Sequence, residues 1–324
     1  MSNIWKPAIF QGRGKKDNYF EGWYFKLVDA TEKISFALIP GISLTGDPET
    51  SHAFIMVFNA RQEEMNYFEF PVEDFKAARD EFQINIGENS FSLQEVHLDL
   101  DHGENKVLAD LNFFDLKPWP VTRLSPGVMG WYGFVPGMEC YHGVLSFDHG
   151  IEGFIQVNDQ MNNFTGGRGY MEKDWGKSMP SSWIWMQTNH FNQEGISLFG
   201  SIAKIPWMGR FFTGFIFGFL YQDHLYKFTT YNGARVDKLE VNKDLIEIRL
   251  SDKNYILEID AKRSQGVDLP APKMGEMSAK VNESLKSEIN VKLYGEDLIF
   301  SGTGRNAGLE FVGDVEELLR GIKR

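Results

Sequence analysis

Hydrophobic residues along this chain either alternate with polar ones or form short continuous runs, and turn residues bound both kinds of segment. The segments with strand length and β-rich composition include YFEGWYFKLVD, KISFALIPGI, HAFIMVFNA, NYFEFPV, FQINI, FSLQEV and KVLADLNFF. Helical periodicity is scarce. Short helices are predicted for VEDFKAARDEF and for the C-terminal VEELLRGIKR, whose late basic residues suit the helix dipole. The pattern therefore predicts an all-β protein with a few short helices.

Two turn-rich segments predict hairpins. GENS separates FQINI from FSLQEV, and FDHGIEG separates GVLS from FIQVN. The longest strongly apolar run without charge, Phe211–Tyr221, has 11 residues, whereas a membrane-spanning helix needs about 20. We expect this run to be a core strand or a pocket wall.

The chain also repeats itself weakly, with a period of about 150 to 160 residues, which is close to the length of one domain. The matching pairs, in chain order, are YFEGWYF with YMEKDWG, ISFALIP with ISLFGSIAKIP, and FIMVF with FIFGFL. Each unit offers roughly eight strands, so closure into a barrel would remove exposed edges and could enclose one apolar ligand. We predict two tandem lipocalin-like (calycin-type) antiparallel β-barrels, formed by residues 1–165 and 166–324.

Composition narrows the possible functions. The 324 residues carry a net charge of −12, which argues against a nucleic-acid partner. Cys140 is the only cysteine, and the N-terminal sequence lacks the apolar run of a secretory signal, so we expect a cytoplasmic protein. The 27 Phe, 11 Tyr and 8 Trp predict either an aromatic core or a large apolar ligand cavity.

Several familiar motifs carry no function here. GTGRNAG at Gly302 lies too near the C-terminus for the helix, second strand and acidic residue of a dinucleotide-binding unit. The spacing of Glu139, Cys140, His142 and His149 matches no standard zinc pattern, so in place of a metal site we expect structural or surface polar residues. Neither a G-x-S-x-G elbow nor a phosphate-binding loop is present. We therefore expect no metal and no cofactor.

The candidate chemistry lies in GGRGYMEKDWGKSMPSSWIWMQTNHF, which begins at Gly166. On a strand, Tyr170, Glu172 and Asp174 would share one face, while Met171, Lys173 and Trp175 would lie on the other. In the structural interpretation, the two acids form ion pairs on a barrel rim with Arg168, Lys173 or Lys177. In the functional interpretation, a buried carboxyl group is a general acid and Tyr170 hydrogen-bonds to it. Trp175, Trp183 and Trp185 would then exclude water and stabilise a developing cation, or else simply pack in the core.

At these residues the sequence resembles the tocopherol cyclase family, and the resemblance covers nearly the whole chain. It is carried by DNYFEGWYFKLVD, WPVTRLSPGVMGWYGFVPGMECYHGVLSFDH, FTGGRGYMEKDWGKSMPSSWIWMQTNHF and GFIFGFLYQDHLYKFTTYNGA. The resemblance implies two lipocalin-like barrels related to those of bacterial carotenoid hydratases. It also implies closure of a chromanol ring from a prenylated benzoquinol without a redox cofactor.

The related hydratases have a pattern similar to G-x-G-Y-x-D-x-x-W-G, with a histidine on an upstream strand. Gly167, Gly169, Tyr170, Trp175 and Gly176 match it, and Glu172 stands where the hydratases have Asp. The resemblance thus implies Glu172 as the proton donor, Tyr170 and His142 as groups that tune or relay the proton, and Asp174 as the second choice for the acid. The residues that we expect to bind substrate are Trp131, Trp175, Trp183, Trp185, His190 and Phe215.

Other functions remain open at this stage. The same barrels could carry a lipophilic quinone or terpenoid without turnover, hydrate a terpenoid alkene, or be filled and inactive. The apolar loop Pro118–Gly137 would either contact a membrane surface, where a lipophilic substrate is dissolved, or pack as a lid. In the first case the protein would be peripheral to the membrane.

Overall fold

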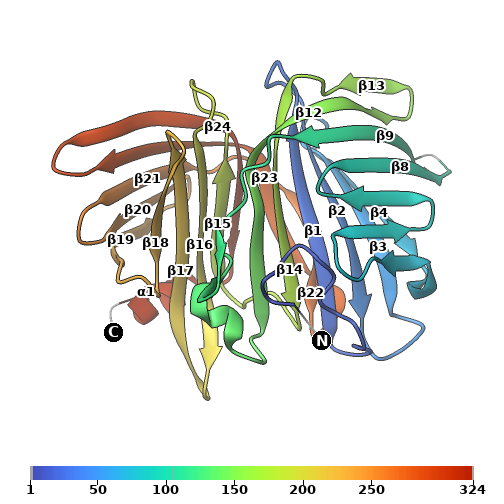
Figure 1. Cartoon of the computed structure of the whole chain (residues 1–324), viewed down its shortest axis with the longest axis horizontal. Coiled ribbons are helices and arrows are strands. Elements are labelled where there is room, and N and C mark those ends of the chain that lie inside the picture. The colour runs from blue at the N-terminus through green and yellow to red at the C-terminus, as the bar shows by residue number, and fades with distance from the viewer. Residues whose placement is uncertain (1–2, 104, 323–324) are drawn as a thin grey trace. The chain divides into compact units, whose positions relative to one another are not determined.

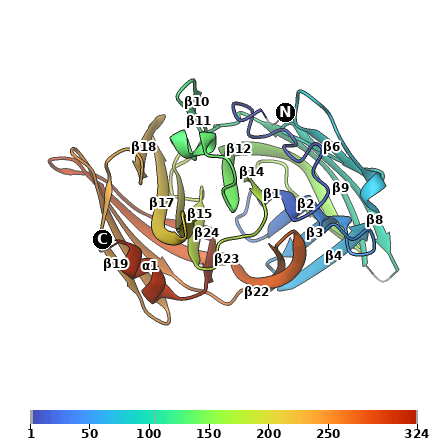
Figure 2. The same cartoon turned by 90° about the horizontal axis from the view of Figure 1, so that it is seen from below.

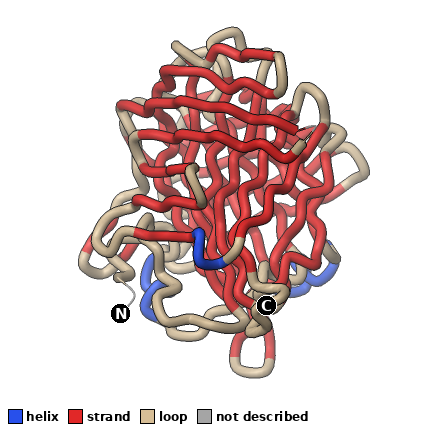
Figure 3. Tube along the Cα trace, turned by 90° about the vertical axis from the view of Figure 1, so that its right-hand side faces the viewer, coloured by secondary structure: helices blue, strands red, loops and turns tan. Residues whose placement is uncertain are grey.

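The computed structural model describes residues 3–103 and 105–322, and antiparallel strands dominate it (Figures 1 and 3). In this part of the chain, helical structure is confined to η1 (Val72–Asp74), η2 (Gly130–Phe134) and α1 (Val315–Ile322). No helix among the described residues has the length and apolar character needed to cross a bilayer. The predicted all-β class is confirmed.

The first large sheet contains twelve strands within the described residues. Its order is β4-β3-β2-β1-β14-β12-β9-β8-β7-β6-β5, and β13 pairs with β12. The strands are β1 (Tyr19–Val28), β2 (Ser35–Leu44), β3 (His52–Asn59), β4 (Glu64–Phe70), β5 (Phe75–Ala77), β6 (Gln83–Ile86), β7 (Asn89–Ser92), β8 (Glu95–His102), β9 (Asn105–Phe114), β12 (Cys140–Val157), β13 (Gln160–Asn163) and β14 (Gly167–Gly176). A separate short pair consists of β10 (Val121–Thr122) and β11 (Ser125–Pro126).

The second large sheet contains ten of the described strands and is curved (Figure 2). Its order is β18-β17-β16-β15-β24-β23-β21-β20-β19, and β22 pairs with β23. The strands are β15 (Trp183–Thr188), β16 (Ser197–Trp207), β17 (Arg210–Tyr221), β18 (His224–Thr229), β19 (Arg235–Val241), β20 (Leu245–Ser251), β21 (Ile256–Lys262), β22 (Val267–Lys273), β23 (Glu276–Tyr294) and β24 (Leu298–Val312).

The chain divides into two compact units. The first comprises residues 1–179 and 270–280, and the second comprises residues 180–269 and 281–324. This division differs from the predicted seam at residues 165 and 166. The reason is that β14 hydrogen-bonds between β1 and β12, so it is an interior strand of the first sheet.

Each unit has its own apolar core, in which aromatic side chains pack together. In the first unit, the ring of Trp23 stacks on that of Phe82 with 5.3 Å between centroids, and Phe25 contacts Phe91 and Phe113 at 6.0 Å. In the second unit, Phe217, Phe219, Ile248 and Val291 are among the fully or nearly fully buried residues. Much of the aromatic content therefore serves core packing.

Two of the predicted elements are wrong. FDHGIEG forms no hairpin, because it lies within the single long strand β12. Register shifts between Val144 and His149, together with a positive φ of 123° at Gly153, bend this strand without reversing it. VEDFKAARDEF forms the short η1 and then β5, because residues 75–77 pair with β6.

Three other predicted elements are confirmed within the described residues: a hairpin turn, a core strand and the C-terminal helix. GENS is a hairpin turn between β6 and β7, and Phe211–Tyr221 lies in the core strand β17. VEELLRGIKR forms α1 as far as Ile322, and residues 323 and 324 lie outside the described part.

Candidate active site

Strand β14 has two chemically different faces. Glu172 lies opposite Tyr24 of β1 and Val144 of β12, and Asp174 lies opposite His142 of β12. Directly paired residues project to the same side of an antiparallel sheet. Tyr170, Glu172 and Asp174 therefore project from the face opposite to the core of the first unit.

The core-facing side of β14 begins with Met171, which belongs to the apolar core cluster. Lys173 is on this side as well and lies opposite Trp23. The alternation predicted for β14 is thus observed. The acids do not point into the interior of the first sheet, where the sequence interpretation places an apolar cavity.

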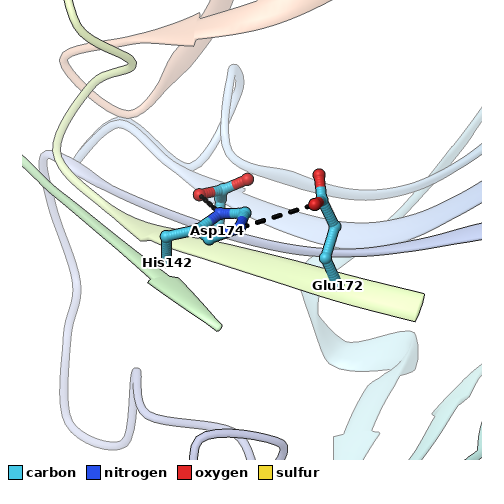
Figure 4. Close-up of side chains that lie close together, drawn as sticks. All are labelled: His142, Glu172 and Asp174. Atoms are coloured by element: carbon cyan, nitrogen blue, oxygen red, sulfur yellow. Dashed lines mark hydrogen bonds and ion pairs between the residues drawn. The ribbon is translucent and has the colours of Figure 1, made fainter. Parts of the chain in front are cut away.

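His142 lies between the two acids, hydrogen-bonded to Asp174 and within ion-pair distance of Glu172 (Figure 4). Its Nδ1 lies 2.8 Å from Asp174 Oδ1, and its Nε2 lies 3.4 Å from Glu172 Oε2. The hydroxyl of Tyr170 donates to the same Glu172 oxygen over 2.5 Å. The side chains of His142 and Glu172 are only 15% and 7% exposed. Four of the sequence-predicted residues are therefore assembled around one shielded carboxyl group.

The charges of this group determine where its protons reside. Burial disfavours the charged imidazolium, but Asp174 and Glu172 outweigh that effect and raise the pKa of His142 to about 9. Burial, reinforced by Glu172, raises the pKa of Tyr170 well above its usual value, so its hydroxyl remains a hydrogen-bond donor. At neutral pH the arrangement holds an imidazolium beside two carboxyl groups, which is a local proton reservoir.

Cys140 is a further neighbour of Asp174. Its thiol lies 3.6 Å from Asp174 Oδ1, the oxygen that also binds His142. Burial and the charge of Asp174 raise the pKa of this thiol well above its usual value. Cys140 is therefore a neutral, weak hydrogen-bond donor to the acid, which sequence reasoning missed because a lone cysteine carries no spacing pattern.

Two of the three cations proposed as rim partners of the acids, Arg168 and Lys173, are engaged elsewhere. Arg168 forms a two-point ion pair with Asp148, with nitrogen–oxygen distances of 3.0 and 2.6 Å. Lys173 pairs with Glu21 at 2.5 Å on the core-facing side, and neither side chain is exposed. These contacts disfavour the rim ion-pair interpretation for both cations.

The Lys173–Glu21 pair is held by the N-terminal segment of the chain. Lys173 donates to the carbonyl oxygens of Pro7, at 2.9 Å, and of Ile9. Glu21 accepts the amide N–H groups of residues 11 and 12 at 2.8 to 3.0 Å, and the hydroxyl of Tyr19. Sequence reasoning missed Glu21. Its signal in the sequence is its position two residues from both Tyr19 and Trp23 in a largely apolar strand, which places it on the same face as these rings.

The aromatic residues predicted to bind substrate do not form one wall. Trp175 lies on the opposite face from the acids and stacks on Tyr141, with ring centroids 5.6 Å apart. Trp131 is 47% exposed and stacks on Tyr132 in η2. Neither observation supports the predicted contact with a substrate at Glu172, because strand alternation separates Trp175 from that face and Trp131 is at the surface.

The other predicted binding residues belong to the second unit. Trp183 donates to Glu310 over 2.7 Å, and Trp185 lies over Gly308, where an added Cβ would come within 2.6 Å of its ring. His190 forms an isolated bridge with Arg305. Phe215 packs in the apolar core, so its predicted role in substrate binding is not supported.

Close packing explains the glycines of the GTGRNAG segment, which the sequence analysis rejected as a dinucleotide-binding loop. An added Cβ would lie 2.6 Å from the ring of Phe300 at Gly302, and 2.3 Å from Thr188 at Gly304. Glycine is needed here for close approach within β24 and not for a phosphate.

A pocket of about 360 Å³ lies in the second unit. It is lined by Phe191, Asn192, Gln193, Ile196, Tyr221 and residues 299–303. None of the predicted site residues is in this lining.

His142, Glu172 and Asp174 also offer one possible metal-ligand atom each within 4.8 Å of one another. Metal ligation requires a neutral imidazole nitrogen. The hydrogen bond to Asp174 and the raised pKa of His142 favour the protonated ring. The group fits a proton-transfer site better than a metal site.

Comparison with known proteins agrees with the sequence resemblance. Residues 114–313 match the model of the tocopherol cyclase-like family. The chain belongs to this family. It is 26% identical over 169 residues to a protein of Oryza sativa subsp. japonica described as probable tocopherol cyclase, chloroplastic, which is 48% of this chain and 34% of that protein. It is 24% identical over 153 residues to the chloroplastic tocopherol cyclase of Zea mays, which is 44% of this chain and 31% of that protein. The chain thus matches about a third of the length of these family relatives.

Solved structures share the fold at low sequence identity. CghA matches with a TM-score of 0.61 and 10% identity, over 97% of this chain and 93% of that chain. Kievitone hydratase from Nectria haematococca matches with a TM-score of 0.50 and 10% identity, over 97% and 96%. These similarities support the two-sheet fold, and they say nothing about activity.

Proposed function

We propose that this protein cyclises a prenylated benzoquinol to a chromanol by acid catalysis, without a cofactor. The single observation that carries the proposal is the buried carboxyl group of Glu172, which contacts Tyr170 of the same strand and His142 of the neighbouring β12. Membership of the tocopherol cyclase-like family supports the reaction type. We also propose that each sheet closes into a lipocalin-like barrel.

The reaction begins when the Nε2 proton of the His142 imidazolium passes to Glu172. The carboxyl proton of Glu172 is then transferred to one carbon of the prenyl C=C bond. The π electrons form the new C–H bond, the other carbon becomes a tertiary cation, and Glu172 becomes a carboxylate. The phenol oxygen of the same molecule then attacks the cation, which forms the C–O bond of the ring. The phenol proton passes through Glu172 to His142 Nε2 and restores the imidazolium. Atoms and electrons balance within one substrate molecule.

The neighbouring side chains have distinct roles in this scheme. Tyr170 fixes Glu172 Oε2 by donating its hydroxyl. Asp174 orients the His142 ring through Nδ1, so that Nε2 points toward Glu172. Tyr24 presents an aromatic ring on the same face, directly opposite Glu172, and can stabilise the cation through its π-face. Shielding from solvent keeps water from capturing the cation.

Two other outcomes are tested together with this proposal. A hydratase would use the same protonation and then add water, and the similarity of residues 167–176 to the pattern of the carotenoid hydratases makes this the main alternative. A carrier would bind a quinone or terpenoid without turnover, and the pocket of the second unit is the observation that favours it.

The test is incubation of the purified chain with 2,3-dimethyl-5-phytyl-1,4-benzoquinol and related prenylquinols in D₂O, followed by mass-resolved chromatography. Cyclisation gives a chromanol that carries one solvent deuterium on the carbon beside the new C–O bond. Hydration adds the mass of water, and a carrier returns unchanged quinol.

The matched pair of variants is Glu172→Gln and Glu152→Gln, the latter at an exposed position of β12. We expect Glu172→Gln to lower turnover by roughly 100-fold or more, as loss of a general acid does. Glu152→Gln is expected to retain the activity. Full turnover by Glu172→Gln with every quinol would refute the assignment of the acid.

A further inference from the structure

Exposed aromatic and aliphatic side chains gather in one part of the first unit. Of the eleven large hydrophobic side chains that are exposed among the described residues, five belong to the N-terminal segment or to the loop Pro118–Gly137. They are Trp5, Val121, Leu124, Trp131 and Phe134, with exposures of 42 to 81%.

These two segments contact each other, although more than 100 residues separate them in sequence. The rings of Trp5 and Phe134 meet edge to face, with 5.8 Å between centroids. The indole N–H of Trp5 donates to the carbonyl oxygen of Arg123 over 3.4 Å. The N-terminal segment accordingly runs beside the loop that carries β10, β11 and η2 (Figure 2). We call the five exposed side chains the aromatic patch.

The charge of the same segments is opposite to that of the chain. Residues 3–16 and 118–137 contain five basic residues and no acidic one, whereas the whole chain has a net charge of −12. The basic residues are Lys6, Arg13, Lys15, Lys16 and Arg123, and all are exposed. Lys6 and Arg13 donate to backbone carbonyls of residues 77–80. Within the described residues, none of the five forms an ion pair with a carboxylate.

We propose that the aromatic patch and its basic rim dock on the surface of a bilayer that contains anionic lipid. Exposed Trp and Phe side chains favour the boundary between headgroups and acyl chains. Lys and Arg beside them attract anionic headgroups, while a net negative chain keeps other faces away from such a surface. The combination of bulky exposed rings and basic charge selects this partner over a neutral apolar protein surface. The proposal holds whether or not Glu172 carries out the cyclisation.

The test is flotation of the full-length chain with vesicles of zwitterionic lipid, with and without roughly 30% anionic lipid, at low and high salt. Binding is expected with the anionic vesicles and is expected to weaken in high salt, because exposed charges are screened. Lys16→Gln/Arg123→Gln should weaken binding about 25-fold, from about fivefold for each charge near the surface. Leu124→Ser/Phe134→Ser should weaken it about tenfold or more, through lost apolar burial.

Matched controls use equivalent side chains outside the patch. Met208 and Leu298 are 91% and 55% exposed, so Met208→Ser/Leu298→Ser removes exposed hydrophobic surface elsewhere. Lys243→Gln/Lys253→Gln removes two exposed charges of the second unit. Both controls should bind like the parent chain, and circular dichroism should show the same folded spectrum for all variants.

Three results would overturn the proposal. One is absence of flotation with anionic vesicles at low salt. Another is equal loss of binding in patch and control variants. The third is a stable dimer in solution that Leu124→Ser/Phe134→Ser converts to monomer, since a second copy would then be the occupant of the patch.

Discussion

The proton balance at His142 gives a stability prediction with a definite sign. The ring is held between Asp174 and Glu172, which raise its pKa to about 9 against the cost of burial. An unfolded chain has its histidines near pKa 6.5. Between these two values the folded protein binds a proton at His142 that the unfolded chain has released. Stability must therefore fall as pH rises through this window.

The size of the effect follows from the same two values. Each pKa unit corresponds to about 1.4 kcal/mol, so a difference of about 2.5 units corresponds to about 3 kcal/mol. The contribution is complete below about pH 6.5, decreases steadily above it, and is lost above about pH 9. Only 15% of the His142 side chain is exposed, so solvent screening removes little of this contribution.

The perturbation is His142→Gln, which keeps a polar side chain of similar size and removes the titration. Urea unfolding of both proteins at pH 6.5, 7.5 and 9.0 gives two curves of stability against pH, and their difference isolates His142 from other groups. We expect the difference to shrink by about 3 kcal/mol across this range. The assigned His142 ring resonance should titrate near pH 9 in NMR spectra. Parallel curves for the two proteins, or a ring pKa near 6.5, would refute the electrostatic reasoning.

Four further substitutions test residues on β14 and the partner of Lys173 on β1. Lys173→Met and Glu21→Gln should each lower the free energy of unfolding by about 3 to 5 kcal/mol, because each leaves a buried charge or its hydrogen-bond partners uncompensated. In urea unfolding, the double variant should lose less stability than the sum of the two single losses. Strict additivity of the two losses would contradict the pairing. Tyr170→Phe should lower kcat by roughly 10- to 100-fold through loss of a hydrogen bond to Glu172, and unchanged kcat would exclude the role of the hydroxyl. Gly169→Ala should cost about 2 kcal/mol of stability, because the new Cβ would lie 2.3 Å from the His149 ring; a neutral effect would show that the ring moves freely.

The strand pattern was readable from sequence because most strands are bounded by turn residues and alternate or stay apolar throughout. The pattern failed where one strand continues through a segment that looks like a turn. In β12, the glycines near His149 serve bulges and close strand contacts, such as the approach of Asp110 to Gly153, and not a chain reversal. The seam between the units was also unreadable, because β14 resembles the first strand of a new repeat while its hydrogen bonds belong to the preceding sheet.

The polar part of the site was predictable and its aromatic part was not. Period-two alternation places Tyr170, Glu172 and Asp174 together, and the backbone register brings His142 to them. The same alternation places Trp175 on the opposite face of β14 from the acids. The ring of Trp175 therefore cannot contact a substrate bound at Glu172, as its predicted role requires. Nothing in the local sequence shows that Tyr24, on a strand almost 150 residues earlier, lies opposite Glu172.

The two faces of β14 explain why three adjacent charged residues can occupy one buried strand. Lys173 points to the core side and is neutralised by Glu21, which fixes the backbone between Glu172 and Asp174. The acids on the other face are thus freed from the neighbouring lysine and share the positive charge of His142 instead. On the side of the acids, the ammonium group of Lys173 would compete with the imidazolium of His142 for the two acids. The ion pair with Glu21 therefore leaves His142, which can give up its proton, as the cation that pairs with Glu172 and Asp174.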